Sequence, residues 1–176
     1  MSYKHLHGKM YITETLLGNQ FQIHPLSFFQ CNLHGAEVLY KTVEELCQFK
    51  NNTILLDVCC GTGIYNAEYF SGLAEKLLPQ ILQDHIEEED DIVAVLNPGR
   101  GGVGKKVTRA LRRCENIRRV VFASCKPLGR MQFNMIELCC PINEEFVGEP
   151  FLPTKAIPVD MFPHTRHYEL VVLFER

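Results

Sequence analysis

The sequence has no C-x-x-C pair, no internal repeat and no long apolar run. Its eight cysteines are not spaced as a tetrahedral set of ligands, which argues against a zinc site. No apolar stretch approaches the 18 or more residues of a membrane span, and the polar first ten residues predict neither a signal peptide nor an anchor. We therefore expect no metal and no membrane partner.

The cysteines and the composition indicate one compact intracellular domain. With 46% hydrophobic residues, a chain of 176 residues can bury one real core. The adjacent cysteines at 59–60 and 139–140 lie in apolar segments, which predicts reduced and buried thiols. We expect a monomer with a single domain over residues 1–176, in which 1–33 is a lead-in segment and 34–176 is the core.

Acidic residues are almost absent from one stretch. Between positions 100 and 130 there are ten lysines or arginines and the single acid Glu115, although the net charge of the chain is −3. The acidic run at 87–91 supplies many of the negative charges that offset these cations, and it is typical of a solvent-exposed surface. The basic stretch predicts a polyanionic partner such as a nucleic acid.

A cysteine follows the apolar run at 118–123, which is short and rich in β-branched residues and predicts a buried strand. Pro127 ends the strand, so Cys125 is expected at the carboxyl end of a parallel strand, where open α/β sheets bind ligands. The positive charges of Lys126 and Arg130 would favour its nucleophilic thiolate. The alternative is a buried cysteine that packs as a small hydrophobe.

Further elements follow from periodicity and turn residues. The first helix, expected over 34–49, turns Val38, Leu39, Val43, Leu46 and Cys47 inward and has Asn32 as its N-cap. A buried strand is expected from position 53 into the glycine turn, and residues 72–78 look like the approach to a later strand. The remaining expectations are strands over 92–97, 156–160 and 168–174, helices over 105–113 and 130–140, and a loose link over 141–153.

The glycine turn at 61–63 follows the first buried strand, and Asp57 stands near the end of that strand. Glycine allows close approach of a ligand to the backbone, and the segment resembles the first strand and loop of S-adenosylmethionine-dependent methyltransferases; the alternative is an ordinary tight turn. Only 29 positions separate Gly63 from Ile92, whereas one βαβ unit takes roughly 30 or more. We therefore expect an incomplete α/β, Rossmann-like fold that lacks a βα segment after Gly63, with a mostly parallel sheet and a terminal antiparallel strand pair.

Five stretches stand out in order along the chain: Phe28-Phe29-Gln30-Cys31-Asn32, Leu56-Asp57-Val58-Cys59-Cys60-Gly61-Thr62-Gly63, Asn97-Pro98-Gly99-Arg100-Gly101-Gly102, Ser124-Cys125-Lys126-Pro127 and Phe162-Pro163-His164-Thr165-Arg166-His167-Tyr168-Glu169. With these stretches the chain resembles the catalytic domain of the RNA uracil-5-methyltransferases, the TrmA/RumA-like family, and the animal mitochondrial members look closest.

The resemblance implies methyl transfer from S-adenosylmethionine to C5 of uridine in tRNA, with rRNA as a second candidate, in mitochondria. It implies Cys125 as nucleophile and Glu169 as catalytic base. A thiolate added at C6 activates C5, and a carboxylate must then remove the C5 proton, so we expect both groups to face one cavity. The implied cofactor contacts are Gln30, Asp57, Gly61, Gly63 and Asn97, and the implied substrate contacts are Arg100 and Lys126.

Other interpretations remain for these residues. Glu169 could be a surface carboxylate, Gln30 a helix-start hydrogen bonder, and Asn97, where the family usually has aspartate, a turn residue before Pro98. Arg100 and Lys126 could be solvated cations. The expected second strand with its ribose-binding acid and the amino-terminal RNA-binding portion of the family are both missing, so a non-catalytic RNA-binding remnant is the alternative function. A thiol hydrolase is a more distant one.

Overall fold

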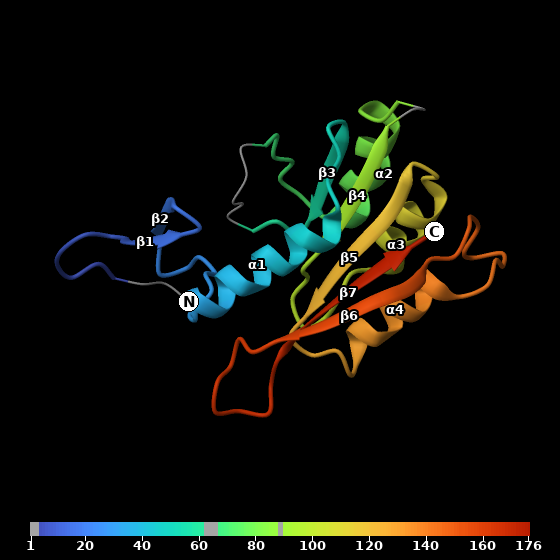
Figure 1. The fold of residues 1–176 in the computed structure, drawn as a ribbon. Coiled ribbons are helices and arrows are strands. Elements are labelled where there is room, and N and C mark those ends of the chain that lie inside the picture. Colours follow the sequence, from blue (N-terminus) through green and yellow to red (C-terminus); the bar gives the residue numbers. More distant parts are fainter. Residues whose placement is uncertain (1–3, 62–66, 88–89) are drawn as a thin grey trace.

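The computed structural model describes residues 4–61, 67–87 and 90–176, and its centre is a sheet of five strands in the order β3-β4-β5-β7-β6 (Figure 1). Strands β3 (Thr53–Val58), β4 (Asp91–Leu96) and β5 (Ile117–Ser124) are parallel neighbours. Strand β7 (Glu169–Glu175) pairs antiparallel with β5 and with β6 (Leu152–Val159). The expected fold class, with its terminal antiparallel pair, is confirmed.

Helices cover both faces of the sheet. Helix α1 (Leu33–Cys47) packs on one face, whereas α2 (Ala74–Asp84), α3 (Lys105–Arg113) and α4 (Arg130–Cys139) pack on the other. Side chains alternate along the buried strands, so Val121 and Ala123 of β5 face α1 while Val120 and Phe122 face the three helices. Each face thus has its own apolar core.

Three expectations about elements were wrong. Residues 72–78 lead into helix α2 rather than a strand, even though Pro79 lies inside that helix. Strand β3 is only partly buried, because within the described residues it pairs with β4 alone and forms an edge of the sheet. Val38 is 54% exposed and does not face inward, whereas the other expected residues, Leu39, Val43, Leu46 and Cys47, are buried and are joined by Ala36.

The ends of the chain also differ in detail from the prediction. Strand β6 begins inside the expected link, at Leu152, and the lead-in segment contains a hairpin of β1 (Ile12–Leu16) and β2 (Asn19–Ile23). Cys59 and Cys60 are exposed, because they follow an edge strand, and Cys139 and Cys140 are half-buried. All eight cysteines are free thiols, as predicted.

Two buried arginines connect the elements. The Arg119 side chain, on β5, donates to the Cys47 and Gln48 carbonyls at the end of α1, at 2.7 and 2.6 Å, and to Asp91 Oδ2 at 2.5 Å. Arg112, on α3, is fully buried and donates to the carbonyls of Glu137, Cys140 and Gly148 at 3.1, 2.8 and 2.7 Å. Both cations therefore bind carbonyls that a helix end leaves without partners, and Arg112 also binds the Gly148 carbonyl in the loop after α4.

Candidate functional site

The carboxyl ends of the three parallel strands meet at one edge of the sheet. Asn97 follows the last residue of β4, and Cys125 follows the last residue of β5; both are half-buried. Because β4 and β5 are parallel neighbours, these two residues stand at adjacent strand ends, and the expected place of Cys125 at the carboxyl end of a parallel strand is confirmed. This edge is where a ligand would meet side chains from several strands.

Glu169 is the first residue of β7, and the antiparallel pairing brings it to the same edge. The last pair of the β5–β7 ladder is Ser124 with Leu170, so Cys125, one residue after Ser124, and Glu169, one residue before Leu170, lie at the same end of these two strands. The Cys125 side chain packs against the core beneath α2, α3 and α4. Cys125 and Glu169 are 44 positions apart in the sequence, but the fold brings them to the ends of neighbouring strands.

Two carboxyl groups near this edge are shifted toward the neutral form. Burial raises the pKa of Glu169, which is 4% exposed, from 4.5 to about 7. Burial also raises the pKa of Asp57, the penultimate residue of β3, from 3.8 to about 6. The cause in both cases is loss of hydration. A carboxyl group with a pKa near 7 can accept a proton at neutral pH and release it again.

Tyr40 of α1 connects the expected cofactor residues with the expected base. Its hydroxyl lies within interaction range of the Gln30 side chain and within electrostatic reach of Asp57 and Glu169. The pKa of Tyr40 is raised, first by burial and then by the Asp57 charge. Sequence reasoning missed Tyr40, although its position four residues after Ala36 on the inward face of α1 was a readable signal.

The segment before α1 is fastened to the loop before β7. Asn32 caps α1 as predicted, since its Oδ1 accepts from the Gly35 N–H at 3.0 Å. Its Nδ2 also donates to the Met161 carbonyl at 3.2 Å. Gln30, two residues earlier, is thus held beside the chain that leads into Glu169.

A groove of about 860 Å³ runs beside the edge strand β3 and helix α2. Asp57 and Gly61 line it, and Gly61 has a φ of +60° with open space where a side chain would stand. Its size fits a small-molecule ligand. Gly63, expected beside Gly61, lies outside the described residues. The groove is lined mainly by apolar side chains, including Ile54, Leu56, Phe70, Leu77, Leu78, Ile81 and Ile86.

The loop after β4 carries a tight turn at the same edge. The Gly102 N–H donates to the Gly99 carbonyl at 2.8 Å, and Arg100, inside this turn, is exposed. Lys126, beside Cys125, is exposed too. The Arg100 and Lys126 side chains are therefore accessible to a polyanion at the carboxyl ends of β4 and β5, a region that we call the basic rim.

Two absences concern the described parts of the chain. Residues 4–61, 67–87 and 90–176 hold no cluster of three or more His, Cys, Asp or Glu side chains suited to a metal ion. Within these ranges no helix has the length and apolar character needed to cross a membrane.

Comparison with known proteins gives relatives along nearly the whole chain. It is 40% identical to the tRNA (uracil-5-)-methyltransferase homolog B of Mus musculus and 42% identical to that of Homo sapiens, over 99% of this chain and 42% of theirs. It is 36% identical to the homolog A of Mus musculus, over 98% of this chain and 33% of that protein. The predicted resemblance is confirmed. No family model matches the chain.

A solved structure shows the same fold. The tRNA (uracil-54, C5)-methyltransferase of Pyrococcus abyssi, in complex with S-adenosyl-L-homocysteine, superposes with a TM-score of 0.65 and 24% identity, over 96% of this chain and 45% of that one. The chain spans less than half the length of each of these relatives. The region matched to the homolog B proteins is 210 residues long, 34 more than the whole chain.

Proposed function

We propose, from homology to the tRNA (uracil-5-)-methyltransferases along almost the entire chain, that this protein is an S-adenosylmethionine-dependent methyltransferase that modifies C5 of uridine in tRNA. The relatives' names support the reaction and the substrate. The observation that carries the proposal is the β5–β7 register, which brings a cysteine and a carboxyl group of raised pKa to one sheet edge. rRNA stays a second candidate substrate.

The residues at the edge fit the cofactor. Asp57 and Gly61 would hold it from the β3 side, since the open space at Gly61 admits a ligand close to the backbone. Gln30, near Tyr40, and Asn97, directly after β4, would complete the contacts. The cofactor supplies the methyl group.

The chemistry needs one thiolate and one base. The Cys125 thiolate forms a bond to C6 of uracil, and the electron pair of the C5–C6 double bond makes C5 nucleophilic for methylation. Glu169 then takes the C5 proton, the double bond forms again and the C6–S bond breaks, which returns the thiolate. Arg100 and Lys126 at the rim would bind phosphates of the flipped-out nucleotide's strand.

The test uses two variants with opposite outcomes. Cys125→Ala is expected to give no covalent protein–tRNA complex on a denaturing gel, because no thiol adds to C6. Glu169→Gln is expected to accumulate that complex in its methylated form, because addition and transfer proceed while proton removal stalls. Cys114→Ala, which removes another half-buried thiol, is the control. Normal release of product by Glu169→Gln would exclude Glu169 as the base.

A second candidate function rests on the size of the chain. The 34 residues by which the matched region exceeds this chain are close to the roughly 30 of one βαβ unit, and β3 is an exposed edge beside an open groove. The candidate is a shortened protein that keeps the basic rim and binds RNA without cofactor. Calorimetric titration with S-adenosyl-L-homocysteine separates the two, since micromolar binding argues for the enzyme and no binding for the RNA-binding form.

Location is a further part of the proposal. We place the protein in mitochondria on the resemblance to the animal mitochondrial members stated above. Imaging of the tagged protein in its own cells tests this, and a purely nuclear or cytosolic signal would contradict it.

A further inference from the structure

We propose that Asn134 of α4 is a positioning residue that fixes the loop at 97–104, and with it Asn97 and Arg100, against the helix that follows Cys125. The consequence for ligand binding rests on the proposed function. The inference itself concerns the backbone geometry of the loop, which can be measured without activity.

The primary observation is a two-point contact that we call the Asn134 clamp. Asn134 Oδ1 accepts from the Val103 N–H and Asn134 Nδ2 donates to the Val103 carbonyl, both at 2.9 Å. Asn134 is 2% exposed and Val103 is 6% exposed, so water cannot readily replace either bond. A side-chain amide that pairs with both backbone polar groups of one buried residue fixes the position and orientation of the two peptide units on either side of it.

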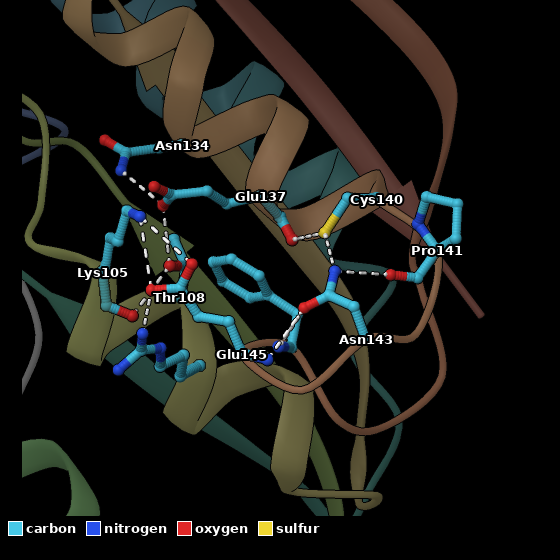
Figure 2. Close-up of polar contacts among 10 residues, drawn as sticks. Lys105, Thr108, Asn134, Glu137, Cys140, Pro141, Asn143 and Glu145 are labelled. Atoms are coloured by element: carbon cyan, nitrogen blue, oxygen red, sulfur yellow. Dashed lines mark hydrogen bonds and ion pairs between the residues drawn. The ribbon is translucent and has the colours of Figure 1, made fainter.

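A second layer orients the clamp. Glu137, one turn further along α4, accepts from Asn134 Nδ2 at 3.1 Å and from Thr108 Oγ1 of α3 at 2.8 Å (Figure 2). A carboxylate accepts only, so its contact with the Asn134 side chain determines which end of the amide is the donor. The amide therefore presents its oxygen to the Val103 N–H and its nitrogen to the Val103 carbonyl.

The Asn134 side chain also leaves no room for a side chain at the neighbouring Gly102. Gly102 has a φ of +67°, and a Cβ there would lie 2.2 Å from Asn134 Oδ1. The turn that holds Arg100 can thus approach α4 only because Gly102 has no side chain. A third support comes from α2, where Glu75 Oε1 accepts from the Gly104 N–H at 3.2 Å.

The position of α4 gives the clamp its consequence. The helix begins at Arg130, five residues after Cys125, so its placement is coupled to the turn that carries the thiol. The clamp joins this helix to the loop after β4. One buried amide therefore sets the relation between the residues expected to meet the cofactor and the residue expected to meet the uracil ring.

The first experiment is hydrogen exchange on the full chain. Asn134→Ala is expected to speed exchange of the Val103 amide by tenfold or more, and of its neighbours in 99–104, while β5 amides keep their protection. Asn143→Ala is the matched control, because that side chain also bonds backbone, at Pro141, Glu145 and Phe146, but touches only the loop after α4. Unchanged exchange at Val103, or an equal rise throughout the protein, would overturn the proposal.

A double-mutant cycle tests the geometry. Gly102→Ala is expected to destabilise the protein strongly with Asn134 present and much less in the Asn134→Ala background, because the atom it would meet is gone. Additive effects of the two substitutions would contradict the clamp.

Ligand binding then connects the clamp to the proposed function. If the wild-type chain binds S-adenosyl-L-homocysteine, Asn134→Ala should raise its Kd about tenfold, and an unchanged Kd would refute the positioning of cofactor residues. If the wild-type chain does not bind it, the proposed function fails, while exchange and the cycle still decide whether the clamp fixes the loop.

Discussion

The buried Glu169 carboxyl should make the stability of this protein depend on pH in a defined direction. In the unfolded chain its pKa is 4.5, and in the folded protein burial raises it to about 7. Below pH 4.5 both states hold the proton and the effect vanishes. Between 4.5 and 7 the unfolded chain ionises first, so the folded state loses stability as the pH rises, and above 7 the loss is constant.

Glu169→Gln tests this, because the amide keeps the shape of the side chain and cannot ionise. At about 1.4 kcal/mol per pKa unit, the ionisable carboxyl costs the folded state up to roughly 3.4 kcal/mol at high pH and about 1 kcal/mol at pH 5. The free energy of unfolding of Glu169→Gln minus that of the wild type should therefore increase by about 2.5 kcal/mol from pH 5 to pH 8.5. Urea unfolding at both pH values measures the gap.

The control removes a carboxylate without burial. Glu115→Gln, at an exposed position, reports any general effect of losing one negative charge. A difference between wild type and Glu169→Gln that stays constant across this range, or that shrinks as the pH rises, would show that the carboxyl is hydrated or paired in the folded protein. Its suitability as a base near neutral pH would then lose its physical basis.

Two further predictions concern the supports of the fold. Arg119→Ala should lower the free energy of unfolding by about 3 kcal/mol or more, since Asp91 and two carbonyls lose their buried partner, whereas the exposed neighbour Arg118→Ala should change it by less than about 0.5 kcal/mol in the same urea titration. Gly148→Ala should cost about 1–3 kcal/mol more than Gly18→Ala in thermal unfolding, because both have positive φ but only at Gly148 would a Cβ meet backbone, 2.2 Å from the Arg112 carbonyl oxygen; equal costs would refute the clash.

Much of the sheet could be predicted from the sequence because its strands have a simple pattern. The apolar runs before Asn97 and Cys125 are buried on both faces, and each ends at a turn residue. The sequence therefore predicted the two strands and the points at which they end, and the structure pairs them as neighbours. Helix α3 was predicted with its observed bounds, because Val107, Ala110 and Leu111 recur at helical spacing among cations.

Other parts depend on contacts that periodicity does not contain. The partial exposure of β3 follows from what pairs with it, and an apolar run reads the same at an edge as at the centre of a sheet. Helix α2 was missed because Pro79 and short apolar groups obscure its period. Tyr40 and Asn134 were missed because their importance lies in contacts with residues far away along the chain, such as Asp57 and Val103.

The place of β7 in the sheet has a consequence for the order of folding. β7 lies between β5 and β6, and both of these precede it in sequence, so β6 has no partner in the sheet until β7 has inserted. Strands β6 and β7 are neighbours in the sequence, but the β5–β7 pairing joins residues as distant as Arg119 and Glu175. Such a long-range pairing forms slowly, because the loop-closure entropy is lost before the contacts are gained. Cys125 and Glu169 come to the same end of the sheet only after that insertion. A folding intermediate without β7 would therefore hold Cys125 next to an unpaired strand edge, which makes this step the one most exposed to aggregation.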